Sequence, residues 1–578
     1  MKKIYVIFLI IGVLVISAYV YVRQSLATPG FDPPPVNQAA AAETKPAESP
    51  LDLKPKLVEK LQQLVKQGSN GLYNLFVREV QPDILNSTVT ITKASLIPDT
   101  AAMHKLEKSG GLPGQVFKIE ADAIRINGLG IKDILSKDVI DVKSIAIVRP
   151  IIDVYSSRKS VTGSQSHQTL YQRLMDQMKH IGIGKLVIEH ATLVTHDPGT
   201  SKSTRFNDIA VNLSDIVIDS TTQFDKNRFL FARDADLTLK DYSIRTSNDL
   251  YTLKVGTIAI QATKQRMVAK EVSLQPIYGK SEFQKHIQIQ KERYDISIPI
   301  IEFNNTDWWN LVNNKQLLAS SAEVKKIAVS VYLDRRKPMG KTEMNGFPHQ
   351  LLMKIPIKIN IQKLKIDDLD LSYEEFNKLS NQAGNFSVTN IHGTVLNLTN
   401  LPAAIKRNHI TTAAVIGTFM NSVPAQLKLH FDLSNYQTGA FTAELNSNKG
   451  FNGPMVNPIA EPLGLFTVKR GELKELHSQV QGDNQQATGN VTILYENLHL
   501  TPLKKDPQNS GELKKKSVTS LIANTFVLKD ENPSKDGEVR RADASFTRNS
   551  GTFFNLIWKT TLVGILKTIG APTKLASQ

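Results

Sequence analysis

The segment IQKLKIDDLDLSYEE (361–375) carries the pattern that most of the chain repeats. Apolar and polar residues alternate as far as Ile366 and again from Leu369, which is the period of a β-strand with one apolar and one polar face. Asp367 and Asp368 interrupt this alternation, as a tight turn or a bulge does. We therefore expect a strand, a turn and a second strand here.

A second segment, IGKLVIEHATLVTHD (183–197), follows the same pattern about 178 residues earlier. Self-similarity over such a distance indicates a repeat. Flanking segments match in the same order: IKDILSKD (131–138) with TDWWNLVNNK (306–315), VKSIAI (142–147) with VKKIAV (324–329), and FNDIAVNLSDI (206–216) with VTNIHGTVLNL (388–398). We expect two copies of one β-rich module in the middle of the chain.

The alternation extends from about residue 88 to residue 500, which predicts an all-β fold. Strands and connections of ordinary length use roughly 10–12 residues each, so this region has room for on the order of 35 strands, too many for one β-sandwich. The strands form either a string of sandwiches or one long antiparallel sheet curled into an elongated groove. Periodicity is the same in both. An apolar groove of that size implies a ligand or partner.

In the groove alternative, the aliphatic side chains of one strand phase face the ligand. The run LLMKIPIKIN (351–360) reads as a strand, and it leads into the segment at 361–375. The candidate lining residues are Ile355, Ile357, Ile359 and Ile361, with Leu364 and Ile366 in the second repeat segment and Leu186 and Ile188 in the first.

The amino terminus carries an uncharged run, Ile4–Val22, after two lysines. This run is long enough to span roughly 30 Å of hydrocarbon as a helix. A cleaved signal peptide is the alternative, because Ser25-Leu26-Ala27 offers a cleavage site. The length of the run and the position of Arg23 favour an uncleaved anchor, with the lysines inside and the remaining chain in the periplasm.

A spacer rich in proline and alanine follows at 24–54. Apolar residues between Leu57 and Val65 then recur at helical spacing, which predicts a short amphipathic helix that either caps the first sheet or lies on the membrane. The net charge of +16 suits an anionic membrane surface. We find no nucleic-acid-binding signature, so we expect no nucleic acid partner.

Signatures of catalysis are missing from the sequence. It has no phosphate-binding loop, no zinc-protease motif and no nucleophile elbow. Ser156 and Lys159 match the short S-x-x-K pattern, which arises readily by chance in a serine-rich loop. Cysteine is absent and the histidines are scattered singly. We expect no catalytic residue, no metal site and no cofactor.

The carboxyl terminus predicts a second amphipathic helix at 552–570, ended by Gly570 and Pro572. Phe554, Trp558 and Ile565 share one face of it. Aromatic residues with interspersed lysines suit a helix at a membrane interface. A helix packed on the end of the last sheet is the alternative.

Two segments resemble the AsmA-like family of bacterial envelope proteins, of the type found in Bacteroidetes: GELKELHSQVQGDNQQATGNVTILYENLHLTPL (471–503) and FFNLIWKTTLVGILKTIG (553–570). This family is related to TamB and other bridge-like lipid-transfer proteins. The resemblance implies an elongated β groove with an aliphatic lining, held in the inner membrane and reaching into the periplasm. It also implies a role in moving or positioning phospholipid for the outer membrane, and it supplies no catalytic motif.

The leading hypothesis is an inner-membrane-anchored protein that binds phospholipid in an apolar β groove and touches a second membrane or a membrane protein through 552–570. The alternative is a scaffolding protein of tandem β-sandwiches that binds protein partners and no lipid. The expected segments are an anchor (1–23), a spacer (24–54), two β modules (55–290 and 291–450), an AsmA-like segment with a basic loop (451–550), and a helix with a tail (551–578).

Overall fold

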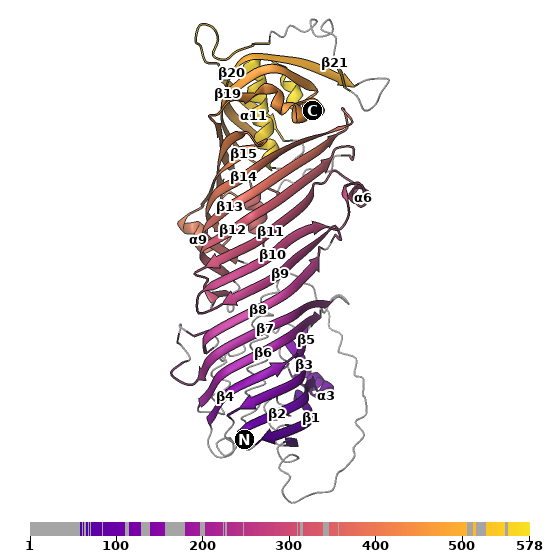
Figure 1. The fold of residues 1–578 in the computed structure, drawn as a ribbon, viewed down its shortest axis with the longest axis vertical. Coiled ribbons are helices and arrows are strands. Elements are labelled where there is room, and N and C mark those ends of the chain that lie inside the picture. The colour runs from indigo at the N-terminus through magenta and orange to yellow at the C-terminus, as the bar shows by residue number, and fades with distance from the viewer. Residues whose placement is uncertain are drawn as a thin grey trace, which may run out of the picture. The chain divides into compact units, whose positions relative to one another are not determined.

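The computed structural model describes residues 58–577 with gaps, of which the longest cover 129–138, 157–179, 197–202, 339–345, 506–512 and 516–527. The expected anchor (4–22) and spacer (24–54) lie outside the described residues. The described residues are mainly strand, which confirms the predicted β class (Figure 1). Helical residues between 58 and 66 agree with the helix expected there. Within the described ranges, no helix is both long and apolar enough to cross a membrane.

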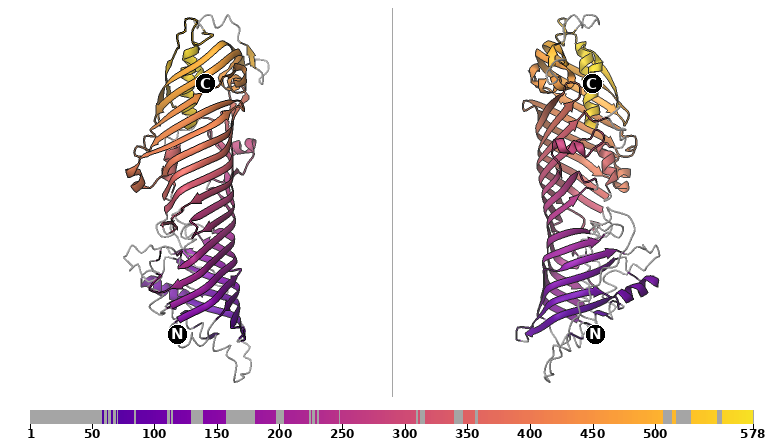
Figure 2. Two further views of the ribbon diagram at one scale, coloured as in Figure 1. Left: turned by 60° about the vertical axis from the view of Figure 1, so that its left-hand side comes forward. Right: turned by 90° about the vertical axis from the view of Figure 1, so that its right-hand side faces the viewer.

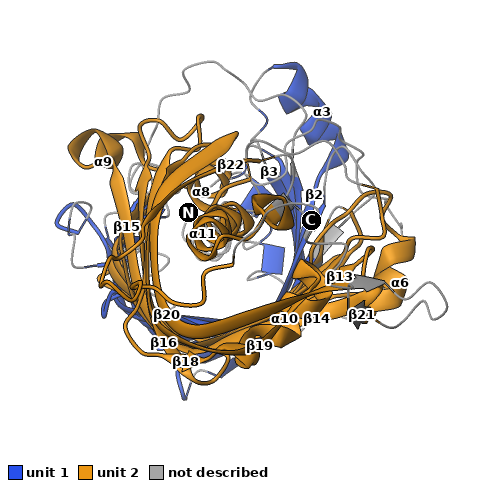
Figure 3. Ribbon diagram, turned by 90° about the horizontal axis from the view of Figure 1, so that it is seen from above, with its two compact units in different colours: residues 1–242, 255–269, 307–315 blue, residues 243–254, 270–306, 316–578 orange. Residues whose placement is uncertain are grey.

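The chain divides into two compact units, coloured in Figure 3. Unit 1 comprises residues 1–242, 255–269 and 307–315, and unit 2 comprises residues 243–254, 270–306 and 316–578.

Most strands of the first β region belong to unit 1. They are β1 (Tyr73–Asp83), β2 (Thr88–Pro98), β3 (Gln115–Asn127), β4 (Val139–Val148), β5 (Ile151–Ser156), β6 (His180–His196), β7 (Ser203–Ile218) and β8 (Ala232–Arg245), with helix α3 (Thr100–Lys108) between β2 and β3. Neighbouring strands from β1 to β3 are antiparallel, and β3 pairs with both β4 and β5. Strands β4 and β5 run parallel to β6, and β6 to β8 are antiparallel again. The hairpin of β9 (Tyr251–Gln261) and β10 (Arg266–Pro276) follows.

The later strands belong to unit 2. They are β11 (Arg293–Asn304), β12 (Gln316–Asp334), β13 (Lys358–Asn377), β14 (Gln382–Thr399), β15 (Ile410–Phe419), β16 (Val423–Asp432), β17 (Phe441–Ser447), β18 (Phe451–Asn452), β19 (Phe466–Gly482), β20 (Gln486–Lys505), β21 (Leu513–Lys515) and β22 (Ala542–Thr547). Its helices are α6 (Lys280–Lys285), α8 (Pro348–Lys354), α9 (Pro402–Arg407), α10 (Asn457–Gly464) and α11 (Phe553–Ile569). Short 3₁₀ turns lie at Gly453–Val456 and Thr573–Ser577.

The expectation of an antiparallel sheet is wrong, because three pairings among the described strands are parallel. Strand β12 runs parallel to β13 along nearly its whole length. A parallel pair requires the chain to cross back to the starting end of the sheet, and the segment between these strands contains α8. This helix also corrects the first part of the strand expected at 351–360, since 351–354 are helical and 358–360 belong to β13. Pro348 suits the first turn, and Gln350 accepts a hydrogen bond from the Phe347 backbone at 3.0 Å.

The segment 361–375 forms one strand, β13, rather than two strands joined by a turn. Asp368 has a φ of 63° and lies where the register with β14 shifts, between Ile366 and Leu369. His190 of β6 has a φ of 51° and lies at the corresponding shift, between Ile188 and Ala191. A bulge adds one residue and restores the phase, so aliphatic residues before and after it share a face.

The repeat is longer than the matching segments indicate. Strands β1 and β9 have equal lengths, as do β2 and β10, and each pair is about 178 residues apart. Left-handed residues also recur, with Arg149 between β4 and β5 and Lys326 within β12. Strands β1 to β7 therefore form the first copy, and β9 to β14 the second. The expected match of 142–147 with 324–329 is out of register, because Ile145 pairs with Leu186 whereas Ala322 pairs with Leu364.

The expected carboxyl-terminal helix is present as α11, and it packs on the sheet of unit 2. Figure 2 shows this helix in yellow beside the orange strands, and Figure 3 shows the strands of unit 2 curving around it. Phe553 packs among Phe347, Phe431 and Phe441 at one end of the helix. A Cβ on Gly564 would lie within 2.5 Å of Val491, so glycine permits the close approach to β20.

Candidate apolar binding face

Apolar residues from β11 to β15 form continuous rows across one face of unit 2. The hydrogen-bonded registers align three such rows: Phe303, Ala322, Leu364, Val395 and Ala413; Ile301, Val324, Ile366, Gly393 and Val415; and Ile296, Val329, Leu371, Val388 and Phe419. We call this surface the apolar face. Residues paired across neighbouring strands project to the same side of a sheet, so the rows lie side by side.

The apolar face is only partly covered. Leu364, Ile366 and Leu371 on its central strand retain exposed surface, whereas Ala322 is buried. The first row continues from Ala413 to Leu429 of β16, where the residues become buried under α11. The same side of the sheet is therefore packed at β16 to β22 and partly open at β11 to β15.

The first copy of the repeat differs at the equivalent positions. Leu186 and Ile188 of β6 are each 1% exposed, and Ile145 of the neighbouring strand is fully buried. Their counterparts in the second copy are Leu364, Ile366 and Ala322. Both copies thus carry aliphatic rows in one register, and the accessible surface is on the second.

The expected lining residues that precede Leu364 do not all lie on β13. Ile361 is buried against Ala319 and Ala322, and Ile359 packs beside them at the start of β13. Ile355 follows α8, outside the strand, and is 37% exposed. Ile357 lies outside the described residues. The structure therefore groups Ile359, Ile361, Leu364 and Ile366 along β13 and separates Ile355 from them.

A charged cluster follows the apolar face along β13. The Tyr373 hydroxyl donates a hydrogen bond to the Glu375 carboxylate at 2.7 Å. Arg335, just after β12, forms an ion pair with Glu375, with its Nη2 at 3.2 Å from Oε2. The Arg335 and Glu375 side chains are 17% and 7% exposed. Burial and the negative charge of Glu375 raise the pKa of Tyr373 well above its ordinary value, so the phenol stays protonated and donates.

Lys559 of α11 lies within electrostatic range of this cluster. Burial, and to a smaller extent the positive charge of Arg335, lower the pKa of Lys559 to about 8 against the opposing effect of Glu375. None of the described residues accepts a hydrogen bond from its amino group. No sequence pattern groups Arg335, Glu375 and Lys559, because they come from three segments that share no local motif.

The three expected membrane-contact residues share one side of α11. Phe554 is 58% exposed and Trp558 is 42% exposed, whereas Ile565 is partly buried and packs against the apolar cluster that contains Val563 and Leu566. Their spacings of four and seven residues place them on one helix face. The opposite side packs on the sheet through residues such as Leu556 and Leu566. One helix thus combines a packed side with an open apolar side.

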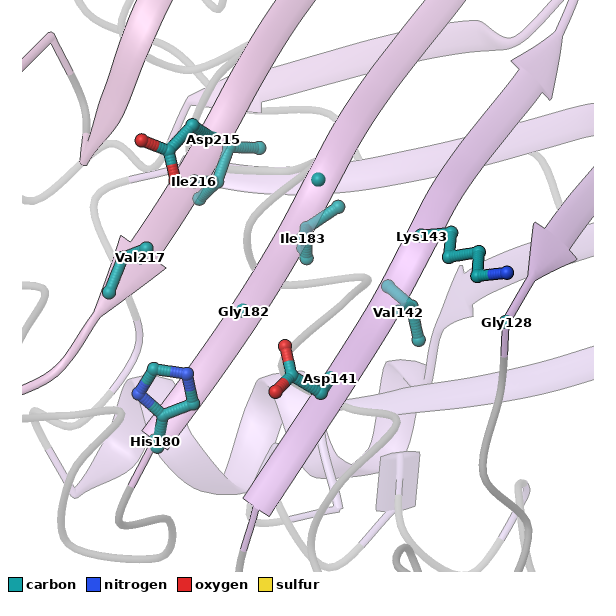
Figure 4. Close-up of a pocket in the computed structure, with 11 residues that line it drawn as sticks. Gly128, Asp141, Val142, Lys143, His180, Gly182, Ile183, Asp215, Ile216 and Val217 are labelled. Atoms are coloured by element: carbon teal, nitrogen blue, oxygen red, sulfur yellow. The ribbon is translucent and has the colours of Figure 1, made fainter.

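Two pockets lie apart from the apolar face, one in each unit. Figure 4 shows one of about 380 Å³ in unit 1, where Asp141 and His180 lie on neighbouring strands. His180 is 3.2 Å from Asp219, and a Cβ on Gly182 would collide with the Asp141 carboxylate. A pocket of about 420 Å³ in unit 2 includes His430 among its lining residues. Across the described ranges, no group of three or more His, Cys, Asp and Glu residues is placed to hold a metal.

No family model matches the chain, and no curated protein shows significant similarity to it.

Proposed function

We propose that this protein binds phospholipid, with the acyl chains against the apolar face of β11 to β15. The observation that supports this proposal most directly is the change in covering along one row. Leu429, Ala443 and Val480 are buried beneath α11, whereas Leu364 and Val395 of the same row keep exposed surface. Extended apolar surface that folding leaves open marks a site for an apolar ligand or partner.

Acyl chains suit the chemistry of this surface. The three rows consist of aliphatic, aromatic and glycine residues and offer no side-chain hydrogen-bonding group. Each methylene group transferred from water to such a surface contributes about 0.8 kcal/mol. Five strands at about 4.8 Å spacing extend over roughly 20 Å, which is the length scale of a fatty acyl chain.

The sequence features suggest where in the cell this lipid binding takes place and what it is for. The uncharged run at 4–22 supports an inner-membrane anchor with the bulk of the chain in the periplasm. The resemblance to AsmA-like proteins supports an elongated groove that conducts or positions phospholipid for outer-membrane homeostasis. The open side of α11, with Phe554 and Trp558 exposed and the partly buried Ile565 beside them, would then contact a second membrane or a membrane protein. That Leu186 and Ile188 of the first copy also line the groove stays a prediction. We place the lipid site on the second copy of the repeat, where the apolar face is accessible.

Lipid mass spectrometry of the purified full-length protein tests this function. The protein is extracted in a mild detergent, washed, and compared with an Ile366→Gln/Leu371→Gln variant, which makes the apolar face polar. We expect co-purifying phospholipid with the unaltered protein and a clear loss with the variant. A scaffolding protein would carry no lipid above that of an unrelated anchored protein, and this result would refute the proposal.

A further inference from the structure

We propose that His180 and Asp141 bind a divalent transition-metal ion such as Zn²⁺ in the pocket of unit 1 that Figure 4 shows. The two residues belong to different strands, and the parallel pairing of β4 with β6 brings them together. Asp141 is paired with Gly182, which follows His180 by two residues. This site would be a second function of the chain, since it lies in unit 1 and shares no residue with the apolar face.

The imidazole of His180 and the carboxylate of Asp141 converge above Gly182. A Cβ built on Gly182 would lie 2.2 Å from Oδ1 of Asp141 and 3.1 Å from Nε2 of His180. Ile181 and Ile183 are buried in the core, so Gly182 between them faces the other side of the sheet, where the pocket lies. Because this position has no side chain, both ligand atoms are within reach of one small ion.

His180 is held in the orientation that a metal-binding histidine needs. Its Nδ1 lies 3.2 Å from Oδ2 of Asp219, and the Thr221 hydroxyl fixes this aspartate by donating to Oδ1 at 2.6 Å. When the Nδ1–H donates to the carboxylate, Nε2 carries the lone pair. Metal-binding histidines almost always have such a partner for their other ring nitrogen.

Asp141 carries the negative charge that an ion would neutralise. Its carboxylate forms no hydrogen bond or ion pair with any residue that the structure describes. Lys143 lines the same pocket, but Figure 4 shows its amino group directed away from Asp141. Asp215, on another wall of the pocket, is already paired with Arg228 and Arg233. The ligand that suits the point between Asp141 and His180 is therefore a cation.

The second copy of the repeat lacks this arrangement. The registers of the two parallel pairs align Asp141, His180 and Gly182 with Leu318, Lys358 and Asn360. A leucine and a lysine thus replace the two ligands, and an asparagine side chain occupies the position of the glycine. The repeated fold does not require these three residues, so their convergence in the first copy calls for another explanation.

The two ligand types define the class of ion. Imidazole nitrogen suits Zn²⁺, Cu²⁺ and Ni²⁺, whereas Ca²⁺ and Mg²⁺ take oxygen ligands. Across the described ranges no third His, Cys, Asp or Glu residue joins the pair, so water fills the remaining coordination positions. An ion there ties together the beginnings of β4 and β6, because Asp141 lies near the start of one strand and His180 begins the other.

Calorimetric titration with Zn²⁺ tests this site on the full-length protein, in detergent and after removal of metals with a chelator. We expect a Zn²⁺ site that His180→Gln and Asp141→Asn each weaken at least about ten-fold. Asp219→Asn changes only the partner of the imidazole, and it should weaken binding by about ten-fold. Zn²⁺ should also raise the melting temperature of the unaltered protein and have less effect on that of His180→Gln.

His190 provides a matched control on the same strand. Its Nδ1 also pairs with an aspartate, Asp208, at 2.6 Å. His190→Gln should therefore leave the Zn²⁺ affinity unchanged, and Mg²⁺ should not bind in place of Zn²⁺. Equal Zn²⁺ affinity in the unaltered protein and in His180→Gln would overturn the proposal. A zinc-soaked crystal of the unaltered protein gives a check that needs no variant, since an anomalous peak is expected between His180 and Asp141 and its absence would also overturn the site.

Discussion

His190 and Asp368 occupy equivalent positions in two long strands about 178 residues apart, and both have left-handed backbone conformations. Each residue shifts the register of its strand without ending it. The bulge explains why the sequence alternation changes phase at this point while Ile366 and Leu371 remain on one face. The repeat is therefore visible in backbone conformation as well as in sequence.

The left-handed backbone at Asp368 predicts a position-specific effect on stability. A β-branched residue is strained there, so Asp368→Val should destabilise the protein by about 1–2 kcal/mol. Ser372→Val, at an exposed extended position on the same strand, should change stability by less than about 0.5 kcal/mol. Thermal unfolding of the two variants measures the difference. Equal shifts would contradict the bulge at Asp368.

The different burial of Leu186 and Leu364 predicts that the same Leu→Ala substitution lowers the free energy of unfolding by different amounts in the two copies. Leu186→Ala removes a side chain that is 1% exposed, which should cost about 2–5 kcal/mol. Leu364→Ala, at the equivalent and partly exposed position, should cost less than about 2 kcal/mol in lipid-free protein. Unfolding by urea, followed by circular dichroism, compares them. A Leu364→Ala cost as large as that of Leu186→Ala would show that the apolar face is packed in solution.

Lys559 predicts a pH dependence of stability. Its pKa of about 8 in the folded protein lies below the ordinary lysine value of 10.5, so folding opposes its protonation. The resulting penalty, on the order of 3 kcal/mol, is fully present below pH 8 and disappears as the pH rises toward 10.5. Lipid-free Lys559→Met should therefore melt at a higher temperature than the unaltered protein at pH 7, and the gap should narrow by pH 10. A gap independent of pH would indicate a packing effect instead.

The open side of α11 predicts a separation of membrane binding from stability. Phe554→Ser/Trp558→Ser alters exposed side chains, so the melting temperature should change little, while binding to liposomes of anionic phospholipid should weaken. The assay uses the protein without residues 1–23, so that the expected anchor does not dominate binding. Leu556→Ser on the packed side is the control, and it should lower the melting temperature. Unchanged liposome binding by the double variant would exclude this face as a membrane contact.

The spacing of apolar residues in the sequence predicted individual strands and helices and the faces on which their apolar residues lie. The alternation at 361–375 identified the strand and its apolar face, and the spacing of Phe554, Trp558 and Ile565 identified one side of a helix. The run 351–354 was assigned wrongly, because a short apolar segment fits both a strand and a helix and only the flanking Pro348 and Gln350 distinguish them.

Features that depend on contacts between distant segments of the chain could not be predicted from the sequence pattern. The parallel pairing of β12 with β13 follows from the path of the chain between them, which alternation does not encode. Arg335, Glu375 and Lys559 meet only through tertiary packing, and no spacing in the sequence links them. The unequal covering of Leu186 and Leu364 is likewise invisible in two segments with the same pattern.

Lipid contact with the apolar face is tested most directly by photo-crosslinking in living cells. A photoreactive amino acid at Leu371 projects to the apolar side of β13, and the same group at the neighbouring exposed Ser372 projects to the opposite side. Mass spectrometry of the purified adducts should find phospholipid attached at Leu371 and little or none at Ser372. Protein adducts alone at Leu371, or equal lipid labelling at both positions, would contradict lipid binding by this face.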